Sequence, residues 1–108
     1  MSLPLKTLEA FTKHVWAAAN DRSICSLKLA GENGFRTVYP HGIFIGKDKK
    51  LTMVCWQKSG YSAKGVEKGY KTLLVEKFEN VMVLNKKFVK RRDFNPKEAR
   101  YGTWLFHI

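Results

Sequence analysis

Cysteine is scarce in this sequence, which limits how the fold can be held together. Only Cys25 and Cys55 are present, each in a mainly apolar stretch. Two cysteines are too few for a disulfide framework or for a zinc site built from cysteines. We therefore expect two buried, reduced thiols in a protein of a reducing compartment.

Long apolar runs are also missing. The start "MSLPLKTLEAF" has no apolar run behind a basic segment, which a signal peptide needs. No stretch approaches the roughly 20 apolar residues that cross a membrane. These features predict a soluble, cytoplasmic protein with no membrane partner.

The residue patterns of common active sites are absent as well. His14, His41 and His107 stand apart from one another, no HxH, HExxH or CxxC spacing occurs, and the acidic residues are scattered singly. The stretch "GKDKK" does not match the phosphate-loop pattern GxxxxGKS/T. We therefore expect no enzymatic activity, no catalytic residue, no metal and no cofactor.

Acidic residues are few in comparison with basic ones. The chain has 20 lysines and arginines against 9 acidic residues, for a net charge of +11. The excess is uneven, because residues 47–108 carry 15 basic and 6 acidic side chains. Such a field favours phosphate-rich or otherwise anionic partners, although a basic balance also serves solubility alone.

The length and one periodic segment define the start of the fold. A chain of 108 residues is the size of one domain with one core. Pro4 suits a first helical turn, and Asn20-Asp21 suits a helix end. Between them, apolar residues recur at spacings of three and four and predict an amphipathic helix: Leu5, Leu8, Phe11, Val15 and Ala18.

From residue 22 the apolar residues alternate, which predicts short strands. The expected strands are "RSICSLKLA", "FRTVYP", "GIFI", "LTMVCWQ", "YKTLLVE", "VMVL" and a final "TWLFHI". "GENG" and "GKDKK" predict hairpin turns, "QKSGYSAKGVEKG" a thirteen-residue connection, and "KFEN" one helical turn. Pro40 is expected to end its strand, because proline cannot donate to a strand ladder, so that His41-Gly42 can turn.

Short strands of this kind tend to close into a small barrel, since closure removes exposed strand edges. We therefore predict a mainly β, α+β protein in which an N-terminal helix precedes a five- to six-stranded SH3-like or Sm-like barrel. The helix occupies residues 1–21, the barrel residues 22–88, and a basic and then apolar extension residues 89–108, all within a single domain.

Three features of residues 22–88 resemble the WYL domain family of bacterial transcriptional regulators and phage-defence proteins. Arg36, Val38 and Pro40 in "RTVYP" match that family's R-x-V-x-P strand. "LTMVCW" occupies the next hairpin arm, and "GYKTLLVEKFENVMVL" is similar to the family's closing segment. The resemblance implies an Sm-like barrel that senses a small ligand or single-stranded nucleic acid in transcription regulation.

The sequence also departs from the family pattern. The three positions that give the family its name hold Leu51, Thr52 and Met53, and Leu74 stands where the family often has an arginine. The acidic-arginine-isoleucine triplet reads "EKF" here. No helix-turn-helix precedes the first strand, so we expect a sensor-type module whose partner is a second copy or a separate DNA-binding protein.

A binding site for an anion needs positive charge, and one for single-stranded nucleic acid also needs aromatic faces on which bases stack. At a pocket mouth we expect three cations, four aromatic residues and one histidine: Arg36, Lys71, Lys77, Tyr39, Trp56, Tyr61, Tyr70 and His41. A second candidate, a phosphate patch, comprises five residues: Lys86, Lys87, Lys90, Arg91 and Arg92.

The same residues also have interpretations that involve no ligand. Arg36 can lie along the barrel wall and pair with Glu76 or Glu79, Trp56 can pack in the core, and the lysines can be solvated charges. The leading hypothesis is a regulatory module that binds an anionic ligand, single-stranded nucleic acid or a nucleotide. The alternative is a protein-interaction or oligomerisation module that uses the helix and "YGTWLFHI".

Overall fold

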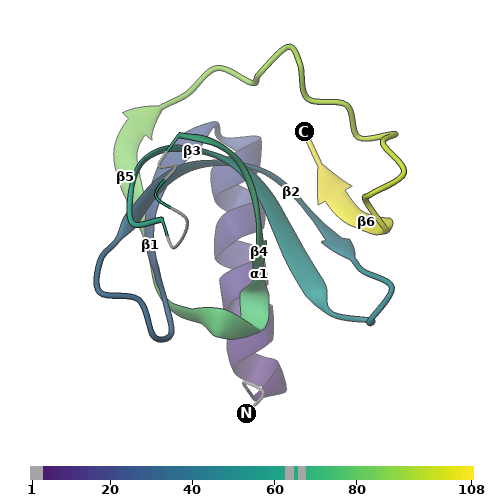
Figure 1. Ribbon diagram of the computed structural model, residues 1–108, viewed down its shortest axis with the longest axis horizontal. Coiled ribbons are helices and arrows are strands. Elements are labelled where there is room, and N and C mark those ends of the chain that lie inside the picture. Colours follow the sequence, from purple (N-terminus) through teal and green to yellow (C-terminus); the bar gives the residue numbers. More distant parts are fainter. Residues whose placement is uncertain (1–3, 63–64, 66–67) are drawn as a thin grey trace.

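The chain forms one helix followed by short strands, as predicted (Figure 1). The computed structural model describes residues 4–62, 65 and 68–108, without the side chain of Leu5. In this part of the chain no helix is long and apolar enough to cross a membrane. The elements are α1 (Leu5–Asn20), β1 (Ser23–Leu29), β2 (Arg36–Ile45), β3 (Leu51–Gly60), β4 (Gly69–Leu74), η1 (Val75–Lys77), β5 (Phe78–Lys87) and β6 (Thr103–His107).

The described strands pair antiparallel in the order β4-β3-β2-β1-β5, with β6 added to β2. One edge of β2 pairs with β3, and the other edge pairs with two different strands along its length. Its residues 36–38 pair with β1 and its residues 42–45 pair with β6. The sheet curls around α1, and the 3-10 turn η1 links β4 to β5 (Figure 1). The predicted small barrel behind an N-terminal helix is therefore confirmed.

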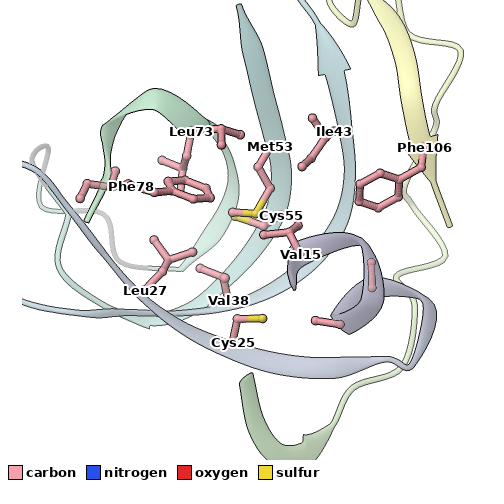
Figure 2. Close-up of a cluster of buried hydrophobic side chains, with 14 residues drawn as sticks. Val15, Cys25, Leu27, Val38, Ile43, Met53, Cys55, Leu73, Phe78 and Phe106 are labelled. Carbon is pink, nitrogen blue, oxygen red and sulfur yellow. The ribbon is translucent and has the colours of Figure 1, made fainter. Parts of the chain in front are cut away.

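The inner face of the sheet and one side of α1 share the main core. Alternation places Cys25, Leu27 and Leu29 of β1 on this face, and all three are buried, as predicted. Figure 2 shows the side chains of several elements gathered in one cluster: Val15, Val38, Ile43, Met53, Cys55, Leu73, Phe78 and Phe106. Fully burying one such side chain contributes about 1.5–3 kcal/mol. The core thus joins α1 to all six described strands.

A second, smaller core lies on the outer face. Val54 points away from the inner cluster, yet it is buried with Phe44 because residues 88–102 cover both. Phe94 and Tyr101 supply the cover, and the Trp104 indole nitrogen donates to the Pro96 carbonyl at 2.8 Å. Figure 1 shows this segment passing from the end of β5 to β6. The C-terminal extension is therefore packed on the sheet, and its final strand forms where "TWLFHI" predicted one.

Two connections differ from the sequence expectation. The link between β3 and β4 covers only residues 61–68, because β3 continues to Gly60 and β4 begins at Gly69. Residues 63, 64, 66 and 67 of the predicted loop lie outside the described residues. The single helical turn falls at Val75–Lys77 and overlaps the predicted "KFEN" only at Lys77.

Pro40 does not end its strand, contrary to prediction. β2 runs through Pro40, and the register against β3 shifts so that Pro40 faces Cys55 and Gly42 faces Val54. His41 is the extra residue of this bulge. On the edge of β2 away from β3, Pro40 lies between the part that pairs with β1 and the part that pairs with β6, so neither of these strands is in register with the proline.

Gly42 lets β6 approach the bulge, and Gly42→Ala should destabilise the fold. A Cβ at this position would lie 2.7 Å from the Phe106 carbonyl oxygen and from the Trp104 ring. Since β6 must shift to make room, we expect a loss of about 1–3 kcal/mol in the free energy of unfolding, measured with urea. Gly34→Ala is the control, because its nearest neighbour would be Tyr61 Cβ at 3.7 Å. Equal stability of the two variants would contradict this packing.

Candidate anion-binding surface

The residues predicted to share one pocket lie on two faces of the sheet. Lys71 is opposite Cys55 in the register of β3 and β4, whereas Tyr70 is opposite Trp56. Successive strand side chains point to opposite faces, so Lys71 lies on the inner side with Cys55, and Trp56 and Tyr70 lie on the outer side. The expected single pocket is therefore replaced by two groups of residues.

The inner group is centred on Arg36, which is buried at one end of the barrel. Its Nε and Nη2 donate to the two Glu32 carboxylate oxygens at 3.0 and 2.6 Å, and its Nη1 donates to Gln57 Oε1 at 2.9 Å. The hydrogen bonds to Glu32 raise the pKa of Arg36. The predicted wall salt bridge thus exists with a different partner, because Glu76 pairs with Lys50 and Glu79 pairs with Lys28.

Three other predicted residues belong to this end. The guanidinium carbon of Arg36 lies 5.7 Å from the ring centre of Tyr61, whose carbonyl accepts from Gln57 at 2.8 Å. Burial raises the pKa of the Cys55 thiol to about 12, while the charges of Arg36 and Lys71 act to lower it. Lys77 borders a hollow of about 270 Å³ that Glu32 also lines. Because Glu32 neutralises Arg36, this end of the barrel offers an incoming anion little from that guanidinium.

The outer group is a row of three aromatic residues on neighbouring strands. Tyr39 of β2 is opposite Trp56 of β3, and Trp56 is opposite Tyr70 of β4. Phe88 and the C-terminal extension that follows it contact the rings of the row in turn. Phe88 stacks on Tyr39 with ring centres 5.1 Å apart, and the guanidinium carbon of Arg91 lies 3.5 Å from the ring centre of Trp56.

The third ring of the row is joined to the extension by hydrogen bonds. The Tyr70 hydroxyl donates to Asp93 Oδ1 at 2.6 Å. The same carboxylate accepts from Nε and Nη2 of Arg91 at 3.0 and 3.3 Å, and this pairing is the main reason that the pKa of Asp93 is lowered. Arg91, Asp93 and the aromatic row therefore form one connected cluster, which no local sequence pattern indicated.

His41 anchors the extension at both of its ends. Its ring is fully buried, and Nε2 accepts from the Arg91 backbone N–H at 3.2 Å. Nδ1 therefore carries the proton and donates to the Tyr39 carbonyl at 2.8 Å. The His41 carbonyl accepts from the N–H of Ile108 at 2.9 Å. The predicted pocket histidine is thus enclosed within the structure, between the sheet and the extension.

The charges around His41 are mostly positive. Burial lowers its pKa, the charges of Lys90, Arg22 and Arg91 lower it further, and only the hydrogen bond to Tyr39 opposes them. Part of the predicted phosphate patch is used for anchoring, since Lys87 pairs with Asp21 and Arg91 with Asp93. The other three members are exposed and have no ion pair within the described ranges: Lys86, Lys90 and Arg92. Of the five patch residues, Arg91 lies against aromatic rings of the outer face, those of Trp56 and Tyr70.

Within residues 4–62, 65 and 68–108, no group of three or more histidine, cysteine or acidic side chains could hold a metal ion. Cys25 and Cys55 are free and buried, as predicted, and burial raises the pKa of Cys25 to about 11. Comparison with known proteins gives no match to a family model, to a curated protein or to a solved structure.

The buried pair between Arg36 and Glu32 should matter for stability. Arg36→Met leaves the largely buried Glu32 carboxylate without its partner, and we expect the free energy of unfolding to fall by about 3 kcal/mol. Lys28→Met is the control, because it breaks a more exposed pair and should cost less than about 1 kcal/mol. Urea denaturation measures both. An Arg36→Met variant as stable as the control would argue that Arg36 is not structural.

The enclosure of His41 should make stability depend on pH. Its folded pKa lies below the unfolded value of about 6.5, so its contribution is complete above that pH and is lost as the pH falls through the folded pKa. The slope from this group is at most about 1.4 kcal/mol per pH unit. Denaturation at a series of pH values should show it, and His41→Gln should remove it while exposed His14→Gln retains it. Parallel profiles for wild type and His41→Gln would refute the assignment.

Proposed function

We propose that this protein is a regulatory module that binds a phosphate-rich anionic ligand, single-stranded nucleic acid, on the outer surface. This surface consists of the aromatic row on β2–β4 together with residues 86–93 of the chain. One observation carries the proposal: exposed, uncompensated Lys86, Lys90 and Arg92 lie in the segment that packs on Tyr39, Trp56 and Tyr70.

The residue types match the needs of such a ligand. A single strand is held by positive charge along its phosphates and by planar groups against its bases. Lys86, Lys90 and Arg92 supply charge that no described acid neutralises, and Arg22 adds to the field near His41. The resemblance to WYL domains supports a sensing role by analogy, with a second copy or a separate DNA-binding protein as the regulated partner.

The choice of the outer surface over Arg36 rests on hydrogen-bond partners. Arg36 gives three of its donor groups to Glu32 and Gln57, so an anion would have to displace a buried carboxylate. The three lysine and arginine side chains of the outer surface face no such competition. An anion reaching them loses only water and counterions, and release of those counterions favours binding.

A second candidate, self-association, has one observation in its favour. Trp16 and Leu105 are partly exposed beside an apolar hollow of about 320 Å³ between α1, the start of β3 and β6. Glu9 and Lys13 lie at this hollow and could pair reciprocally with the same residues of a second copy. Such a contact should persist in high salt, whereas phosphate binding should weaken, so salt separates the two functions.

Neutralising the three uncompensated cations should weaken binding and its dependence on salt. We expect the combined variant Lys86→Gln, Lys90→Gln, Arg92→Gln to bind a fluorescent oligothymidine strand less tightly. The slope of log affinity against log salt should become shallower by roughly 2, since each lost phosphate contact on a single strand contributes about 0.7. Fluorescence anisotropy at several salt concentrations measures both quantities.

The matched control removes the same charge elsewhere. Lys6, Lys47 and Lys49 are exposed, and each becomes glutamine in the control. The start of α1 and the hairpin between β2 and β3 lie far from the end of β5 in Figure 1. The control should therefore bind nearly as wild type does. An equal loss in both variants would reject this surface, and no binding by wild type at low salt would reject the function.

A further inference from the structure

Resting on the proposed function, we propose that the Arg91 guanidinium is a stacking platform for an unpaired base, with Trp56 as its backing. The preferred ligand is then a base-bearing single strand and not a polyanion in general. The sequence had suggested that bases stack on Trp56 itself. Arg91 already lies against the face of that ring, so the open surface of the pair belongs to the guanidinium.

Arg91 is held at three places, which fixes the plane of its side chain. Its backbone N–H donates to His41 Nε2 at 3.2 Å. One edge of the guanidinium donates twice to Asp93, at 3.0 and 3.3 Å, and Asp93 is itself held by the Tyr70 hydroxyl. Its carbon lies 3.5 Å from the ring centre of Trp56. A flexible surface arginine would lose much of its motion on binding a base, and this one has already lost it.

Part of the Arg91 side chain remains accessible to solvent, and we propose that a base stacks there. One face meets the indole and one edge meets a carboxylate, yet 34% of the side chain remains accessible to solvent. The ring centre of Tyr70 also lies 5.9 Å from the guanidinium carbon. In the proposal, the ligand uses the guanidinium face opposite the indole. Arginine planes stack on unpaired bases, and the positive charge adds attraction to the ring. Lys90 and Arg92, the chain neighbours of Arg91, are exposed and suited to the flanking phosphates.

This geometry predicts a selectivity that charge alone does not give. A duplex keeps its bases stacked inside, and a strand without bases has phosphates but no planar group to stack. Both should still be attracted by Lys86, Lys90 and Arg92. Only a single strand with bases should also gain the contact with Arg91.

The test compares ligands of equal charge on the full chain. An oligothymidine strand should bind about 5- to 150-fold more tightly than an abasic strand of the same length, the range expected for one stacked base. Equal affinity for the two strands would overturn the inference while leaving the proposed function intact. If neither strand binds at low salt, the proposed function itself fails.

A conservative pair of variants locates the contact. Arg91→Lys keeps the charge but removes the planar group, so the preference for the base-bearing strand should fall toward 1 while the salt dependence stays unchanged. Arg100→Lys makes the same change at an exposed arginine outside residues 86–93, where Glu98 pairs with it, and it should keep the preference. Thermal denaturation checks that both variants fold. If folded Arg91→Lys retains the full preference, the base is recognised elsewhere and the inference is wrong.

Discussion

The bulge at His41 is the constraint on which both faces of this sheet depend. By leaving His41 out of register, it divides β2 into a part that pairs with β1 and a part that pairs with β6. It also places the imidazole where the extension begins and the His41 carbonyl where the chain reaches Ile108. His41 thus binds the covering segment near its start and at its end, alongside the pairing of β6 with β2. A buried histidine with both nitrogens engaged is a costly feature to disturb, since each unpaired polar atom would lose a hydrogen bond away from water.

Residues 86–92 include several cations that repel one another, and the structure gives these cations different roles. Five cations within residues 86–92 repel one another and would favour an open chain. Lys87 and Arg91 instead turn to Asp21 and Asp93, and Phe88 turns to Tyr39. Lys86, Lys90 and Arg92 are left at the surface. Ion pairs therefore engage two of the five cations, of which Lys87 is itself 57% exposed, and the other three have no ion pair with any described residue.

Sequence patterns predict more of the fold than of the candidate site. The period-two alternation in β1 and the helical spacing of Val15 and Ala18 are local patterns. The strand, the helix and the burial that they predict are confirmed. The same alternation should have separated Tyr70 from Lys71, since adjacent strand residues cannot face one pocket. The stacking of Arg91 on Trp56 is different, because it joins distant parts of the chain and leaves no periodic signal. Glu32 was missed as the partner of Arg36 because it lies in a turn, where spacing does not reveal direction.

The two arginines show how a structural charge differs from one that is open to a ligand. Arg36 meets acceptors on three donor groups and is almost wholly buried, so any ligand must first break bonds that hold the barrel end together. Arg91 is equally fixed, but its bonds lie along one edge and one face, and the plane of the guanidinium has two faces. A side chain that is held rigid but keeps one face open is suited to binding, because its conformational entropy is lost during folding and not during binding. By this reasoning the strand motif around Arg36 serves the fold, and the surface proposed for recognition lies on the segment that the barrel holds in place.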